Sequence, residues 1–262
     1  MRFILFLFTA FTLYASTITL HNGQTFVHHY DKYYATDCKT YTTMNHLLVI
    51  PLSYYTKRSR CKIAIDGKKF ILNITPKNYP KERLHVAKSK VSPPQSVLKR
   101  IRKEFAEAKR IYSTVTPKSY VQNSFVLPIN AAITDPFGVA RLFNGKLKSY
   151  HSGTDFRAAM GTPIKAINDG KVVLAKKRYY AGGSIILDHG KGIYSCYYHL
   201  SKFLVKPGEF VKRGQIIGLS GKSGRVTGPH LHLTIKIKGI TVDPLQFIDA
   251  YNNTLKTVSY PQ

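Results

Sequence analysis

Two short strings in the C-terminal half of this chain, HSGTD and HLH, carry side chains suited to metal chemistry. His151 and Asp155 lie four residues apart, but Gly153 and its small polar neighbours favour a turn at a strand end over a helix. His230 and His232 lie two residues apart, so a strand presents both imidazoles on one face. One of the two can then bind a metal ion while the other stands free beside it.

Two imidazoles and one carboxylate predict a hydrolytic zinc site. Three protein ligands leave the fourth tetrahedral position to water. Bound zinc lowers the pKa of that water and polarises a carbonyl, and histidine is suited to act as the general base near neutral pH. Either string alone arises readily in a chain with ten histidines, but both together, with His199 in YYHLS between them, favour a functional site over coincidence.

Longer strings extend this pattern in a fixed order: ITDPFG, HSGTDFRAAMGTPIKAINDGKV, GGSIILDHGKG, YYHLS, GPHLHL and VDPLQF. On these residues the region from 125 to 250 resembles the lysostaphin/LytM-type zinc metalloendopeptidases, which cleave peptide cross-links in bacterial peptidoglycan. By position, the resemblance implies the metal ligands His151, Asp155 and His232 and the non-ligand catalytic histidines His199 and His230. No essential position of the family pattern is replaced.

The two non-ligand histidines share the remaining chemistry in this interpretation. We assign His199 and His230 jointly to water activation and to stabilisation of the oxyanion. Tyr197, two residues before His199, has two open interpretations: a hydroxyl donor at the site or a packed strand aromatic. Cys196 lies in an apolar strand and is expected to be a buried core thiol rather than a nucleophile. His189, within DHGKG, is expected to be structural.

The N-terminal residues predict export. MRFILFLFTAFTLYAS combines a basic Arg2, an apolar run and a small Ala15, which reads as a signal peptide over residues 1–15. The run is short for a membrane span, and an uncleaved anchor is the alternative. We therefore expect an exported protein without a stable span after cleavage, in the periplasm of a Gram-negative-type envelope. The oligomeric state stays open.

The net charge of +27, from 40 basic and 13 acidic residues, raises nucleic-acid binding as a rival function. The basic residues are dispersed, no Cys/His finger is present, and the leader directs the chain out of the cytoplasm. A wall polymer with carboxylates on its stem peptides fits the charge better, so we expect peptidoglycan stem peptides and no nucleic acid as partners. A basic composition without a specific partner is the alternative.

Residues 16–90 are rich in Thr, Tyr, Ile and Val and predict a small N-terminal β domain. Asp66 and Gly67 separate two apolar runs, which is typical of a hairpin turn. Cys38 and Cys61 are able to form a disulfide in an oxidising compartment. Five histidines of this region, His21, His28, His29, His46 and His85, show no ligand spacing and are treated as non-catalytic.

A helix and linker are expected over residues 91–124. SPPQ offers Ser92 as an N-cap, a Pro at the first helical position and Gln95 for a capping box. An apolar stripe follows at steps of three or four residues, formed by Val97, Ile101, Phe105, Ala108 and Tyr112. We expect the stripe to dock on the β domains. A sharper hypothesis is that this helix or the linker 113–124 covers the substrate groove.

Residues 125–250 read as short strands with Gly turns and no helix, which predicts an antiparallel β catalytic domain followed by a tail over 251–262. The fold class is thus mainly β, and the resemblance implies the duplicated hybrid motif. GKSGRVTG superficially resembles a phosphate loop, but no helix follows it, so we expect a loop wall that leads to HLH.

Three functions remain in contention. The first is a zinc endopeptidase acting on peptidoglycan cross-links, with the D-Ala–diaminopimelate bond as the expected target by analogy. The second is a non-catalytic relative that binds the cell wall and activates another hydrolase. The third is a basic protein that binds nucleic acid or lipid surfaces. The sequence leaves open whether the chain also trims stem peptides as a carboxypeptidase.

Overall fold

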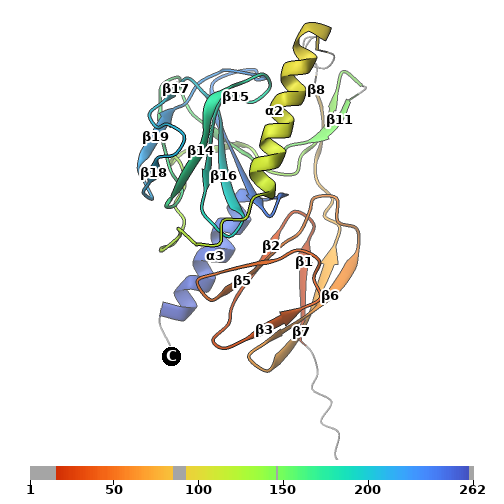
Figure 1. The fold of residues 1–262 in the computed structure, drawn as a ribbon. Helices are drawn as coiled ribbons and strands as arrows, with labels where there is room; N and C mark the ends of the chain where they lie inside the picture. Colours follow the sequence, from red (N-terminus) through yellow and green to blue (C-terminus); the bar gives the residue numbers. More distant parts are fainter. Residues whose placement is uncertain (1–15, 85–92, 146, 260–262) are drawn as a thin grey trace, which may run out of the picture.

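A computed structural model describes residues 16–84, 93–145 and 147–259 (Figure 1). The signal peptide expected over residues 1–15 lies outside these ranges. Strands dominate and two helices, α2 and α3, accompany them in the described residues, so the mainly β prediction is confirmed. Within the same ranges, neither helix has the length and apolar character needed to span a bilayer.

The N-terminal module is a pair of packed sheets. Its strands are β1 (Ser16–His21), β2 (Thr25–His29), β3 (Tyr34–Thr36), β4 (Thr42–Met44), β5 (Leu47–Pro51), β6 (Ser59–Ile65) and β7 (Lys68–Thr75). One sheet has the order β1-β7-β6-β3 and the other β2-β5-β4. Phe26, Leu48 and Ile50 of the smaller sheet pack with Ile63 and Leu72 of the larger one. The two sheets therefore enclose a core of their own.

Both local predictions for this module hold. The β6–β7 hairpin turns at Asp66 and Gly67, whose φ angles of 46° and 83° are the left-handed pair that a type I′ turn requires. Cys38 and Cys61 form a disulfide that fastens the segment after β3 to β6. Both cysteines are buried in the core of the module.

Strand β5 explains why its sequence is a continuous apolar run. All five of its residues are buried. Leu48 and Ile50 face the module core, whereas Leu47 and Val49 point the other way and pack in one cluster with Phe247 and Tyr251 of the C-terminal region. Successive strand residues point to opposite faces, so a strand covered on both sides is apolar throughout. The two halves of the protein therefore share a core.

The connecting segment contains β8 (Lys81–Leu84) and α2 (Gln95–Ser113). The helix begins after Pro94, which occupies the N-cap without a side-chain cap, so the expected capping box on Ser92 is not the helix start, and Ser92 itself lies outside the described residues. Ile101, Ala108 and Tyr112 are buried as expected. Phe105, the central member of the predicted stripe, is instead 61% exposed.

The C-terminal half is built on one eight-stranded sheet. Its strands and their neighbours are β9 (Ile133–Asp135), β10 (Ala140–Phe143), β11 (Leu147–Tyr150), β12 (Thr154–Arg157), β13 (Pro163–Lys165), β14 (Gly170–Arg178), β15 (Gly182–Asp188), β16 (Ile193–Leu200), β17 (Lys202–Phe203), β18 (Phe210–Val211), β19 (Ile216–Leu219), β20 (His230–Ile237) and β21 (Ile240–Val242). The main sheet has the order β18-β14-β15-β16-β20-β12-β9, with β21 paired to β20. The remaining strands form two small sheets, and β8 of the connecting segment joins β10 and β11.

The main sheet is covered on both faces. Ile185, Leu231 and Leu233 lie in the large cluster that extends to the N-terminal module, whereas Ile186 and Cys196 lie in a second cluster with Tyr112 of α2. The free thiol of Cys196 is buried there, as expected. Helix α2 thus packs on the sheet face opposite the main core (Figure 1).

The expectation of no helix after Phe125 is wrong, because α3 spans Pro244–Ser259. The carboxylate of Asp243 accepts hydrogen bonds from the backbone N–H groups of Leu245 and Gln246, and Pro244 occupies the first helical position. Phe247 and Tyr251, four residues apart, then enter the shared core. The start signal, Asp243 followed by Pro244, lies in VDPLQF, within the range 125–250 for which only strands were predicted, and Tyr251 lies in the predicted tail. Figure 1 shows α3 between the main sheet and the N-terminal module.

Candidate metal centre

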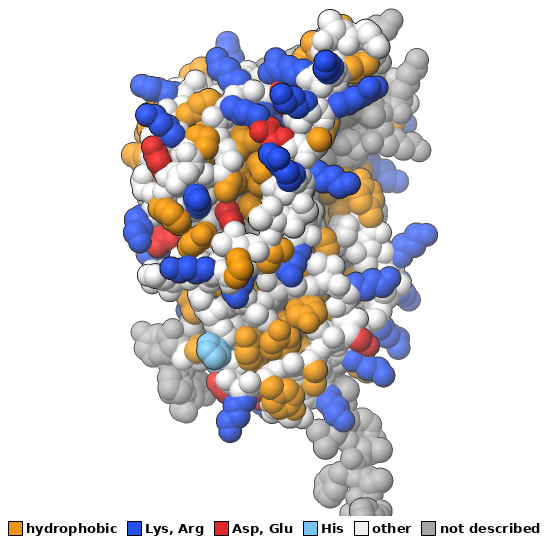
Figure 2. Space-filling view, viewed as in Figure 1, with side chains coloured by type: hydrophobic (Ala, Val, Ile, Leu, Met, Phe, Trp, Pro, Cys, Tyr) orange, Lys and Arg blue, Asp and Glu red, His pale blue; other side chains and the backbone are white. Residues whose placement is uncertain are grey.

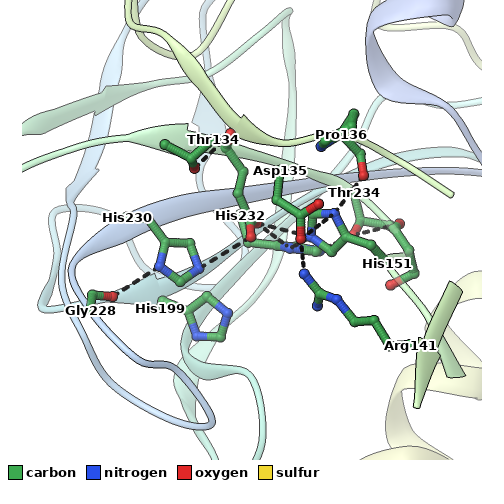
Figure 3. Close-up of polar contacts among 12 residues, drawn as sticks. Thr134, Asp135, Pro136, Arg141, His151, His199, Gly228, His230, His232 and Thr234 are labelled. Atoms are coloured by element: carbon green, nitrogen blue, oxygen red, sulfur yellow. Dashed lines mark hydrogen bonds and ion pairs between the residues drawn. The ribbon is translucent and has the colours of Figure 1, made fainter. Parts of the chain in front are cut away.

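Three of the sequence-predicted residues converge at one point of the main sheet. Oδ1 of Asp155 lies 2.7 Å from Nδ1 of His232 and 3.1 Å from Nε2 of His151, and the two imidazole nitrogens are 3.0 Å apart (Figure 3). Asp155 and His232 are directly paired residues of β12 and β20. His151 precedes β12 in the predicted turn, and all three side chains are almost fully buried.

Hydrogen bonds on the far side of each ring fix which nitrogen carries the proton. Nδ1 of His151 lies 2.8 Å from the carbonyl oxygen of Pro136, which only accepts, so Nδ1 is the donor and Nε2 holds a lone pair. The hydroxyl of Thr234 donates to the carbonyl of Ser152 and therefore accepts from Nε2 of His232, 2.9 Å away. Nδ1 of His232 then also holds a lone pair.

Three lone-pair donors thus face one another within 2.7–3.1 Å. This arrangement is repulsive for neutral imidazoles and a carboxylate unless a cation lies between them. Ligands around tetrahedral zinc, with bonds of about 2.0–2.2 Å, are roughly 3.3 Å apart, so a small outward shift accommodates the ion. The donor set fits zinc, and the expected His/Asp/His cluster is present.

The charge states of Asp155 and His232 are those expected at a cation site. Burial alone raises the pKa of Asp155, but its interactions with the adjacent rings of His151 and His232 outweigh that effect and hold the pKa well below the usual range. Burial lowers the pKa of His232. At neutral pH the carboxylate is charged and the His232 ring is neutral, which is the state that metal binding requires.

The two other candidate histidines flank this centre. Nε2 of His230 is 3.7 Å from Oδ2 of Asp155, and the rings of His199 and His230 are 4.8 Å apart (Figure 3). Nδ1 of His199 bonds the carbonyl of Ser223, and Nδ1 of His230 bonds that of Gly228, so each ring holds its lone pair on Nε2. Burial, followed by the neighbouring His232, lowers the pKa of His199 to about 3.

His199 has a strained backbone conformation beside the metal centre. Its φ is 65°, a left-handed conformation that is unusual for a non-glycine residue. The pairing of β15 with β16 shifts register between Gly183 and Ile185, next to this point. The alternation of side chains between the two faces of β16 is therefore interrupted, and Tyr197 does not share the sheet face of His199. Its ring is buried in the main core and its hydroxyl accepts the N–H of Ile167, so the packed-aromatic interpretation of Tyr197 is correct.

The remaining expectations for this region also hold. His189 is buried and bonds the carbonyl of Asp169 and the hydroxyl of Ser195, a structural arrangement. The segment GKSGRVTG forms a loop without a following helix, and its carbonyl groups orient His199 and His230. The sequence analysis missed the orienting role of Thr234. Its position two residues after His232, on the same strand face, was an available signal.

The site adjoins an aromatic contact between the two halves of the protein. Tyr150, next to His151, stacks on Tyr54 of the N-terminal module with ring centroids 3.9 Å apart. Phe137 and Tyr79 contact the same group. Asp135, which lies 3.5 Å from Nδ1 of His151, is held by Arg141. The N-terminal module thus supports the loop that carries His151.

A β sheet with a candidate His/Asp/His metal site and two flanking imidazoles is typical of one class, the metal-dependent hydrolases. Comparison with known proteins identifies a family within this class, because residues 149–244 match Peptidase family M23. Peptidoglycan DD-endopeptidase ShyA of Vibrio cholerae is 48% identical over 96 residues, which are 37% of this chain and 22% of that protein. Lysostaphin of Staphylococcus simulans is 44% identical over 104 residues, or 37% of this chain and 21% of that protein.

The architecture also has a solved counterpart. The crystal structure of a peptidase M23 from Pseudomonas aeruginosa covers 87% of this chain and 95% of its own, with a TM-score of 0.67 and 27% identity. Residues 149–244 thus carry a peptidase M23 domain, and the resemblance of this region to the lysostaphin/LytM type is confirmed. The matched segment spans about a fifth of the length of ShyA and lysostaphin.

Proposed function

We propose that this chain is a zinc-dependent endopeptidase that hydrolyses peptide cross-links of peptidoglycan. The observation that carries the proposal is the convergence of three lone pairs, from His151, Asp155 and His232, beside two further imidazoles with free Nε2 atoms. Zinc, when bound there, lowers the pKa of a water molecule and polarises the scissile carbonyl. The match of residues 149–244 to Peptidase family M23 and the name of ShyA support peptidoglycan as the substrate.

The protein's own residues supply the proton transfers. His199 and His230 are oriented by carbonyl groups at Nδ1, so their Nε2 atoms are available to take a proton from the attacking water and return one to the leaving amine. In the protonated form, the same rings donate a hydrogen bond to the developing oxyanion. We assign His151, Asp155 and His232 as ligands and His199 and His230 as the catalytic pair.

The proposed bond is D-Ala–diaminopimelate, in keeping with the DD-endopeptidase relatives. Purified zinc-loaded protein is incubated with defined cross-linked muropeptide dimers, and the products are identified by mass spectrometry. Conversion of dimers to monomers that stops on zinc removal and returns on zinc addition supports the proposal. Bound zinc without turnover of dimers or sacculi contradicts it and favours the alternative, a cell-wall-binding activator of another hydrolase.

We also propose export, with residues 1–15 as a cleaved signal peptide and the periplasm as the destination. The Cys38–Cys61 disulfide supports this, since such bonds persist in oxidising compartments. Cell fractionation with N-terminal sequencing of the mature protein tests it. Cytoplasmic protein that retains Met1 and reduced cysteines contradicts it. The domain limits at residues 90, 124 and 250 remain predictions, although α3 crosses the last of them.

A further inference from the structure

A trough of about 710 Å³ runs between α2 and the main sheet. Phe105 and Tyr112 of α2 form one wall, and Tyr198 of β16 and Ile240 of β21 lie on the sheet side. The exposed position of Phe105, unexplained by helix docking, follows from its place on this wall.

The trough adjoins the metal centre through the lining residue Tyr198. The ring of Tyr198 stacks on that of His232, with centroids 5.5 Å apart and an angle of 16° between the planes. Ala181, another lining residue, accepts the backbone N–H of His199 through its carbonyl group. Tyr198 and His232 are also directly paired across β16 and β20, so they lie on one face of the sheet. A ligand in the trough therefore lies beside the site.

The trough is held open by polar contacts of α2. The hydroxyl of Tyr112 lies 3.1 Å from that of Tyr198, and Glu107 pairs with Lys176 of β14. Glu104 accepts the N–H of Tyr179 at 2.8 Å and pairs with Arg100. These bonds fix the helix to the sheet, so the wall is preformed and a ligand loses less free energy to ordering it.

The charged side chains that line the trough are mostly basic. Its cations are Lys109, Arg178, Lys236 and Lys238, and its one acid, Glu104, is engaged as described. Among the residues described by the structure, none of the four cations forms an ion pair. Arg178 donates to the carbonyl of Glu104, and Lys236 donates to Thr241 and lies over the ring of Tyr112. Basic side chains also outnumber acidic ones across the face shown in Figure 2.

We propose that this trough binds a free carboxylate of the substrate peptide and so selects acidic peptides; the proposal rests on the endopeptidase function above. Lys236 is four residues from His232 on the same strand face, which is about 13 Å along the strand. An extended peptide covers that distance in about four residues. The ligand is thus a peptide whose carboxylate lies three to four residues from the scissile bond, with apolar contact along Phe105 and Tyr198.

Lys109 and Lys238 are exposed and lie outside the catalytic machinery, so their double variant, Lys109→Glu/Lys238→Glu, tests the trough. Lys202→Glu/Lys206→Glu changes the charge equally at exposed positions that do not line it. The substrates are one cross-linked dimer with free carboxylates and the same dimer with amidated carboxylates, assayed on full-length zinc-loaded protein. The measured quantity is kcat/KM for each, at two salt concentrations.

We expect the unaltered protein to prefer the free acid by about tenfold, with a preference that falls at high salt. The trough variant loses this preference and keeps its rate on the amidated dimer, whereas the control variant behaves as the unaltered protein. Equal rates on acid and amide, or a preference that survives in the trough variant, overturn the proposal. If neither dimer is cleaved, the proposed endopeptidase function is wrong. The trough is then tested by the binding of fluorescent acid and amide dimers: a preference for the acid that is lost in the trough variant supports it, and equal binding or a preference that survives in that variant overturns it.

Discussion

Asp155 and His232 are opposite one another on β12 and β20, and the ladder of the main sheet holds the carboxylate oxygen 2.7 Å from the imidazole nitrogen. Two candidate ligands on paired strands have little freedom to separate, because their backbones are fixed by neighbouring strands on both sides. His151 enters from a loop, and its position depends on the carbonyl of Pro136. The centre is therefore built mainly on the rigid part of the fold.

Removal of the hydroxyl of Thr234 should weaken metal binding. Thr234→Val leaves Nε2 of His232 without its acceptor, so the ring loses the bond that fixes its tautomer and orientation. We expect zinc affinity to fall about 10- to 100-fold, measured by competition with a chromophoric chelator. Thr43→Val, on a strand of the N-terminal module, is the control. Equal affinities for the two variants would show that Thr234 does not orient the ligand.

The flanking histidines should separate binding from turnover. His199→Ala and His230→Ala remove a base but no ligand, so each should retain one zinc per chain and lose about 10²- to 10⁴-fold in kcat. His151→Ala should instead lose the zinc, and His21→Ala, on exposed β1, should change neither quantity. Metal analysis by mass spectrometry and dimer hydrolysis give the two readouts. Loss of zinc from His199→Ala would make it a ligand and contradict the assignment.

Local features of the fold followed from the sequence, whereas long-range ones did not. The turn at Asp66 and the shared face of His230 and His232 depend on neighbouring residues only, so periodicity and turn chemistry predict them. The exposed position of Phe105 and the shared core of Leu47 with Phe247 depend on segments distant in sequence. The left-handed backbone at His199 is strain at a functional position, which period-two alternation does not describe.

The buried His199 should make the metal-free protein sensitive to acid. Its pKa is about 3 in the folded state and about 6.5 unfolded, so the unfolded state binds more protons between these values. Its stabilising contribution is full above pH 6.5 and is lost as the pH falls toward 3, by about 1.4 kcal/mol per pH unit. His199→Gln should flatten this slope in chelator-treated protein, measured by urea unfolding from pH 7 to 4. An unchanged slope would contradict the assigned burial effect.

The disulfide should stabilise the N-terminal module without contributing to the chemistry. Cys38→Ser/Cys61→Ser removes a cross-link with a sequence separation of 23, which the chain-entropy description values at about 3 kcal/mol. Chemical denaturation should show this loss, while kcat of the folded variant stays unchanged. Cys196→Ser, at the buried free thiol, is the comparison that alters no cross-link. A loss of kcat in the folded double variant would connect the module directly to the site.

The core shared by the two halves predicts that they unfold together. Leu47 and Leu48 are adjacent and fully buried, but Leu47 packs toward the catalytic sheet and Leu48 toward the module core. Leu47→Ala and Leu48→Ala should each lower the free energy of unfolding by about 2–5 kcal/mol in one transition, followed both by circular dichroism and by loss of zinc. A separate early transition in Leu48→Ala, with zinc retained, would show that the module unfolds alone. In that case the stacking of Tyr54 on Tyr150 would be too weak to couple the module to the loop that carries His151.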